Sequence, residues 1–114
     1  MPNLADVENL VRAELPALTF RSTDRGLSIF AGEREIAWQR PLSKKDMTHL
    51  ADRAPLGEVL AIHVDSVETK NAWIAAQPNS CFDSLHFANY PAVLIDLHRC
   101  DLRVVIELLA EHLD

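Results

Sequence analysis

The segment that most constrains the fold is residues 58–64, whose letters EVLAIHV are almost all apolar. A short, nearly continuous apolar run is typical of a strand whose two faces are both covered by the rest of the protein. We therefore expect residues 58–64 to form the central strand of a sheet. The remainder of the chain must then supply its neighbouring strands and the helices that cover it.

Three short strands are expected ahead of this segment and two after it. The first three are separated by short turns, Asp24-Arg25-Gly26 and Ala31-Gly32-Glu33, and turns this short force antiparallel neighbours. The last two are joined by Ala88-Asn89-Tyr90-Pro91. The expected strands are Leu18–Arg21, Leu27–Phe30, Glu35–Arg40, Cys81–Phe87 and Ala92–His98.

Helical periodicity and capping residues predict four helices. The first spans residues 3–15 and stops at Pro16. The second follows the capping-box pair Ser43 and Asp46. The third is capped by Asp65 and runs through Trp73 and Ile74 to a stop before Pro78, and the fourth follows a cap at Asp101. Three helices carry an apolar stripe that predicts the inward face. The stripes are Leu4, Val7, Leu10 and Val11 in the first helix, ended by Leu15; Met47, Leu50, Ala51 and Ala54 in the second, which ends at Pro55 and Gly57; and Leu102, Val105, Ile106, Leu109 and Leu113 in the fourth.

The expected order is helix, three strands, helix, strand, helix, two strands, helix. Strand runs mixed with helices on short connections predict an α+β fold, in which an antiparallel sheet of about five to six strands packs against helices. A chain of 114 residues is one domain by length, so this domain should span residues 1–114.

The charge pattern bears on nucleic-acid binding. The chain has a net charge of −6, and an acidic protein repels nucleic acid unless its basic groups gather on one face. Residues 21–53 hold seven basic and five acidic side chains, whereas the other residues hold four basic and twelve acidic ones. Positive charge is therefore concentrated in the expected hairpins and the helix after them. The alternative interpretation is an ordinary solvated surface of mixed charge.

Cellular context is read from three features. Cys81 and Cys100 form no CxxC motif and are expected to be reduced, buried thiols. The first residues lack the basic and apolar runs of a signal peptide, and no stretch approaches the roughly 20 apolar residues of a membrane span. These features predict a cytoplasmic location without a membrane partner.

Four segments carry a family resemblance, namely residues 36–42, 54–61 and 70–78 and the best-matching one, LHFANYPAVLI at 85–95. Together with the expected last helix they extend over about two thirds of the chain, and they resemble the MmcQ/YjbR family. The family carries a segment resembling T-P-H-F-D-G-Y-P-x-V-L. Here Ser84-Leu85 replaces the Thr-Pro and Ala88-Asn89 replaces the Asp-Gly. Asn89 can adopt the positive φ of a glycine, but Ala88 cannot replace a carboxylate.

The resemblance implies an α+β fold similar to frataxin-like and secretion-chaperone-like domains. It also implies a non-enzymatic binding domain that binds double-stranded DNA through a pair of β wings. In that case Arg34, Arg40, Lys44 and Lys45 would contact phosphates and Trp38 would stack. A protein-interaction module or homodimer, formed through a sheet edge or an apolar strand face, is the alternative.

A third possibility is a small-ligand pocket at the junction of the last two strands, lined by His86, Phe87 and Tyr90, whose architectural alternative is a shaped turn. Strand alternation places Ile36, Trp38 and Arg40 on one face, where Trp38 is either a ligand-stacking ring or part of a core or interface.

Catalytic and metal-binding motifs are not apparent. The five histidines, at positions 49, 63, 86, 98 and 112, form neither an HxH nor an HExxH pattern, so no metal or cofactor is expected. No GxSxG motif, glycine-rich phosphate loop or paired-carboxylate motif points to an enzyme.

Overall fold

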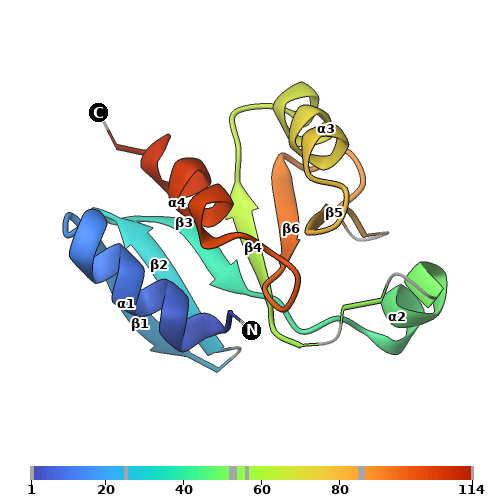
Figure 1. The fold of residues 1–114 in the computed structure, drawn as a ribbon, viewed down its shortest axis with the longest axis horizontal. Helices are drawn as coiled ribbons and strands as arrows, with labels where there is room; N and C mark the ends of the chain where they lie inside the picture. Colours follow the sequence, from blue (N-terminus) through green and yellow to red (C-terminus); the bar gives the residue numbers. More distant parts are fainter. Residues whose placement is uncertain (1, 25, 52–53, 56, 85–86, 114) are drawn as a thin grey trace.

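The computed structural model describes residues 2–24, 26–51, 54–55, 57–84 and 87–113. The order of its elements is the one expected from the sequence (Figure 1), and the fold class is α+β as predicted. The elements are α1 (Leu4–Glu14), β1 (Leu18–Thr23), β2 (Gly26–Ala31), β3 (Arg34–Gln39), α2 (Lys44–Leu50), β4 (Val59–His63), α3 (Val67–Ala76), β5 (Cys81–Phe82), β6 (Ala92–Asp96) and α4 (Leu102–Ala110).

The six strands form one antiparallel sheet in the order β1-β2-β3-β4-β6-β5. The apolar segment at 58–64 supplies β4, which lies between β3 and β6, and residues 59–62 are all buried. The prediction of a central strand is confirmed.

A β-bulge interrupts the pairing of β2 with β3. Ile29 pairs with Ala37 and Phe30 pairs with Glu35, so Ile36 is the extra residue on β3. Both Ile36 and Ala37 belong to the main core cluster, whereas Trp38 belongs to a second cluster. The prediction that Ile36 shares a face with Trp38 is therefore wrong, because the bulge breaks the alternation on which it depended.

Helices cover one face of the sheet. Val7 and Val11 of α1 and Leu108 and Leu109 of α4 are almost fully buried in the main cluster, and Trp73 of α3 packs against it. We call this side the helix face. In Figure 1, α1 lies across β1 and β2, and α4 lies along the middle of the sheet. None of the described helices has the length and apolar character needed to span a bilayer.

The opposite face carries the second cluster, which contains no helical residue within the part of the chain that the structure describes. We call this side the aromatic face. Its buried residues are Trp38, Val59, Ala61, Ala92 and Leu94, with Leu42, Phe82 and Phe87 packed against them.

Helix α2 is shorter than predicted. The capping box between Ser43 and Asp46 is present, but the helix ends at Leu50 because Ala51 adopts a positive φ of 50°, which a right-handed helix cannot continue. Its inward residues are Asp46 and Leu50, whereas Met47 is 39% exposed. The predicted apolar stripe is therefore wrong for Met47 and Ala51.

The predicted cap is wrong for α3 and confirmed for α4. Helix α3 is capped by Ser66, whose Oγ accepts from the Thr69 backbone N–H at 3.1 Å, and not by Asp65 as expected. Helix α4 is capped by Asp101 as expected, and its carboxylate accepts from the Arg103 backbone N–H at 2.9 Å.

The last two strands end earlier than predicted. Strand β5 stops at Phe82, because the Asp83 carboxylate turns to accept from the Ser84 backbone N–H and to bind Lys70. Strand β6 stops at Asp96, whose side chain accepts from the His98 backbone N–H and closes a turn. Between them, residues 83–84 and 87–91 lie outside the strands, and Phe87 packs against the aromatic face.

Candidate functional site

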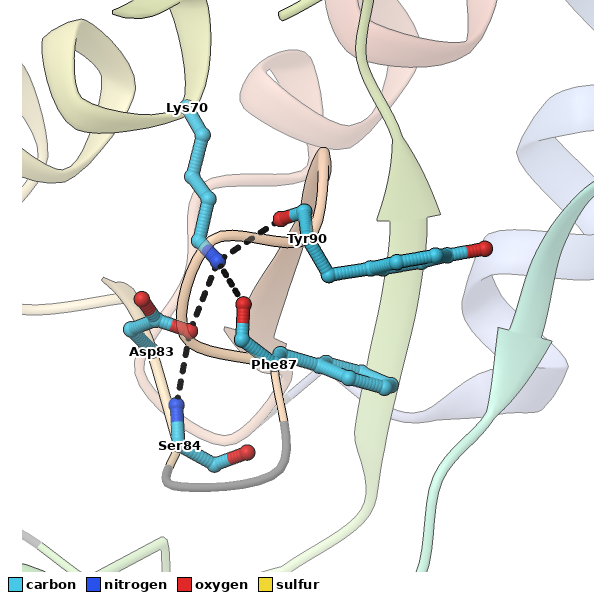
Figure 2. A network of polar contacts seen from close by, with 5 residues as sticks. All are labelled: Lys70, Asp83, Ser84, Phe87 and Tyr90. Carbon is cyan, nitrogen blue, oxygen red and sulfur yellow. Dashed lines mark hydrogen bonds and ion pairs between the residues drawn. The ribbon is translucent and has the colours of Figure 1, made fainter. Parts of the chain in front are cut away.

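A buried lysine organises the loop between β5 and β6 (Figure 2). The Lys70 side chain projects from α3 and is completely buried. Its Nζ donates to the carbonyl oxygens of Phe87 at 2.5 Å and Tyr90 at 2.9 Å, and it lies 2.8 Å from Oδ1 of Asp83. All three donors of the ammonium group are thereby used. A buried charge is tolerated only with such complete partners, so this contact set holds Asp83, Phe87 and Tyr90 in place beside α3.

The backbone of the loop is a tight turn. The Tyr90 N–H donates to the Phe87 carbonyl at 2.8 Å, and Asn89 has a φ of 67°. The expectation that Asn89 takes a glycine-like conformation is confirmed. Because the carbonyls of Phe87 and Tyr90 face Lys70, their rings point away from α3 and toward the strands (Figure 2).

Four rings meet in a closed cycle on the aromatic face. Trp38 of β3 contacts His63 of β4 with ring centroids 4.8 Å apart, and His63 contacts Tyr90 at 5.6 Å. Tyr90 contacts Phe87 at 5.5 Å, and Phe87 meets Trp38 edge-on at 6.1 Å. These tilted and edge-to-face geometries are favourable for aromatic rings. The cycle joins two strands to the loop that Lys70 holds.

Arg40 lies at one side of this cycle. Its guanidinium carbon is 5.1 Å from the centroid of the Phe87 ring, a cation–π contact. Its Nε is buried, and it has no hydrogen-bond partner among the described residues. The Arg40 residue as a whole is only partly buried, so its guanidinium brings a permanent positive charge to this side of the aromatic face.

His63 titrates below the usual range. Burial lowers the pKa of its imidazole, and the nearby His112 and Arg34 lower that pKa further. A hydrogen bond with the Pro91 backbone and the charge of Glu35 oppose this effect. At neutral pH the ring is therefore neutral, which suits its place between Trp38 and Tyr90.

The structure brings together four of the site residues predicted from the sequence. Trp38 and Arg40, expected at a nucleic-acid interface, meet Phe87 and Tyr90, expected in a pocket. Trp38 is only 8% exposed, so its ring is mainly a core element, whereas Tyr90 is 41% exposed. His86 lies outside the described residues.

The remaining predicted residues divide between two places. Lys44 and Lys45 are exposed at the start of α2, shortly after Arg40 in the chain. Arg34 begins β3 at its other end, about 20 Å from Arg40 along an extended chain. There it lines a separate cavity with His63 and His112, so the predicted phosphate-binding set does not form one cluster around Arg34.

Two residues of the site were missed by sequence reasoning. His63 is the one polar side chain inside the apolar run VLAIH, and Lys70 lies three and four residues before Trp73 and Ile74 on the inward side of α3. Both residues could have been found in the sequence, because each is a single polar residue within an apolar strand or an apolar helix stripe.

The two cysteines are poor nucleophiles. Cys81 and Cys100 are free and buried, as expected. Burial raises the pKa of each thiol to about 11, so little thiolate is present at neutral pH. The described residues contain no group of three or more His, Cys, Asp or Glu side chains that could hold a metal ion.

Known proteins add a limited comparison. The chain is 36% identical over 83 residues to uncharacterized proteins of Mycobacterium bovis and of two strains of Mycobacterium tuberculosis. The match covers 70% of this chain, and the chain spans only 64% of the length of these curated relatives. No protein-family model matches the chain. No solved structure matches it either.

Proposed function

We propose that this chain is a non-enzymatic binding domain of the MmcQ/YjbR type, which binds an anionic partner at the Arg40 side of the aromatic face. The order of elements and the turn at Asn89 and Tyr90 support the family assignment. The observation that carries the binding site is the Arg40 guanidinium, which is stacked on Phe87 with an unpartnered inner nitrogen.

Double-stranded DNA is the partner to test first. Lys44 and Lys45 add two exposed positive charges close to Arg40 in the chain, and phosphate oxygens are the ligands that such side chains contact in protein–DNA complexes. The net charge of −6 opposes binding elsewhere on the surface, so the contact area should be small and sensitive to salt.

The test is a fluorescence-polarisation titration of labelled double-stranded DNA at low salt and at physiological salt. The wild-type protein should bind at low salt and lose affinity as salt rises. Arg40→Gln and the pair Lys44→Gln and Lys45→Gln should each weaken binding. Arg34→Gln is the matched control, because it removes the same charge at the far end of β3.

Each outcome has a distinct meaning. An equal loss of affinity in the Arg34 and Arg40 variants would place the contact across both hairpins, as the wing hypothesis originally expects. The absence of binding by the folded wild-type protein at low salt would remove DNA as a direct partner.

A homodimer is a second candidate, favoured by the exposed edge of the sheet. Strand β1 is six residues long and ends the sheet, and among the described strands it pairs only with β2, so its outer edge offers unpaired backbone groups. Neighbouring residues point their N–H groups to opposite sides, so either Phe20→Pro or Arg21→Pro removes an outward donor. One of these variants should abolish a dimer seen by light scattering, whereas a monomeric wild-type protein at all concentrations removes this candidate.

A further inference from the structure

A second cavity lies beside the edge of the sheet where β5 ends. It has a volume of about 820 Å³, within the usual range for small-molecule sites. Its walls come from α2, the end of α3, the segment that leads into β5, and the turn after β6. Neither Arg40 nor any ring of the aromatic cycle is among its described lining residues.

A buried carboxylate lines this cavity. Asp96 is only 2% exposed, and its Oδ1 accepts from the His98 backbone N–H at 3.1 Å. Its Oδ2 is buried without a hydrogen-bond partner among the described residues. Among the described residues, Arg99 forms an ion pair with Asp96, but its Nε lies 3.6 Å from Oδ2, beyond hydrogen-bond distance. A buried carboxylate oxygen without a hydrogen-bond donor is unfavourable in free energy. A ligand that donates a hydrogen bond to Oδ2 would therefore be stabilised in this cavity.

The other residues that line the cavity indicate the charge and the apolar character of such a ligand. The described lining residues include two acids, Asp83 and Asp96, and one permanently charged base, Arg99. Asp83 is already paired with Lys70, so the carboxylate of Asp96 decides the charge of the ligand, and a cationic donor suits it better than an anionic group. Leu50, Ile74 and Phe82 line the same space and offer apolar surface to a hydrocarbon group.

We propose that this cavity binds a small molecule in which a primary ammonium group is joined to a hydrocarbon body, with Asp96 as the counter-ion. The ammonium donates to Oδ2 of Asp96, and the hydrocarbon body packs on the apolar wall. Arg99 competes for the same oxygen from the solvent side, since its side chain is 34% exposed. Displacement of this long ion pair accompanies binding.

The test compares three probes of similar size by NMR titration of the ¹⁵N-labelled protein: 2-phenylethylammonium, neutral 2-phenylethanol and anionic 3-phenylpropionate. The ammonium should bind most tightly and shift the backbone amides of Ser80 and Asp96. Asp96→Asn keeps the shape but removes the charge, so it should weaken ammonium binding about tenfold and leave the alcohol unchanged. Arg99→Gln removes the competitor and should tighten ammonium binding.

Asp65→Asn is the matched control, because Asp65 is exposed and lies outside this cavity. If Asp96→Asn does not fold, the Arg99→Gln variant decides the matter alone. Equal affinity for the ammonium and the alcohol, or an Arg99→Gln variant with unchanged ammonium affinity, would overturn the proposal. Failure of the wild-type protein to bind the ammonium probe would do the same and would assign Oδ2 of Asp96 to water.

Discussion

Nζ of Lys70 lies 2.8 Å from Oδ1 of Asp83, although the lysine side chain is completely buried and the aspartate side chain is 35% exposed. The two residues of this ion pair should therefore contribute differently to the stability of the fold. The Asp83 carboxylate is partly exposed and can also form hydrogen bonds with water, whereas the buried Lys70 ammonium contacts only protein groups. The carbonyls of Phe87 and Tyr90 make Lys70 the centre of the loop.

Replacement of Lys70 by methionine should be strongly destabilising. The methionine fills much of the same volume but leaves two buried carbonyls without their donor, so the free energy of unfolding should fall by about 3 kcal/mol. Asp83→Asn should cost less, about 1–3 kcal/mol, because the asparagine carbonyl can still accept from Nζ although the buried ammonium loses its counter-charge. Urea denaturation followed by circular dichroism measures both.

Lys44→Met provides the control for this experiment, because Lys44 is exposed at the start of α2. Its effect should stay within about 0.5 kcal/mol. A Lys70→Met protein as stable as the Lys44→Met protein would show that the loop does not depend on the lysine.

The stability of the fold should depend on the protonation of His63. Because the pKa of His63 is lowered in the folded protein, the unfolded chain takes up the proton first as pH falls. This contribution is fully present above the unfolded pKa of about 6.5 and is lost as pH falls toward the folded pKa. Between about pH 7.5 and 5.5 the free energy of unfolding should therefore decrease more in the wild type than in His63→Phe.

Urea denaturation at several pH values compares the two proteins, and His49→Gln, a change on an exposed residue of α2, serves as the control. Parallel pH profiles for the wild type and His63→Phe would contradict the prediction.

Two glycines with positive φ should respond differently to substitution. Gly26 has a φ of 120°, and a Cβ there would meet the Gln39 side chain at 2.0 Å, whereas a Cβ on Gly32 would have no atom within 4 Å. Gly26→Ala should cost about 2–3 kcal/mol, and Gly32→Asn should cost under about 1 kcal/mol, since asparagine tolerates the left-handed region. Thermal unfolding of the two variants measures the difference, and equal melting temperatures would refute it.

The thiols should be protected in the folded protein. Both Cys81 and Cys100 are buried with their pKa raised to about 11, so a thiol-specific disulfide reagent at about pH 8 should react slowly with the native chain and quickly after denaturation. Rapid modification of either cysteine before unfolding would show that the described packing opens readily.

The sequence predicted the order of elements because that order depends on local signals. Apolar runs, short turns and capping residues act within a few residues of the chain. The caps at Ser43 and Asp101 lie where predicted, and the cap of α3 is Ser66, one residue after the predicted Asp65. The early end of β5 could not be read in this way. It depends on Asp83 meeting a lysine that is thirteen positions earlier in the sequence.

The candidate site shows the same limit. Trp38, Arg40, Phe87 and Tyr90 were each singled out for their chemistry, but as two separate sets, because nothing in the sequence places the loop after β5 beside β3. His63, which links Trp38 to Tyr90, was placed in neither set. The two sets meet only through tertiary contacts, in which Phe87 packs against Trp38 and Arg40, and residue type alone does not reveal these contacts.

The bulge at Ile36 decides which side of the sheet receives the tryptophan. The two-residue turn between β2 and β3 pairs Ala31 with Arg34, and a regular ladder from that turn would set Ile29 opposite Ile36 and send Trp38 to the helix face. The extra residue at the bulge offsets by one position the alternation of side chains between the two faces in the rest of β3. The number of residues between the turn and Trp38 therefore decides that this side chain lies on the aromatic face. Insertion or deletion of one residue there would move the side chains that follow in β3 to the opposite face of the sheet.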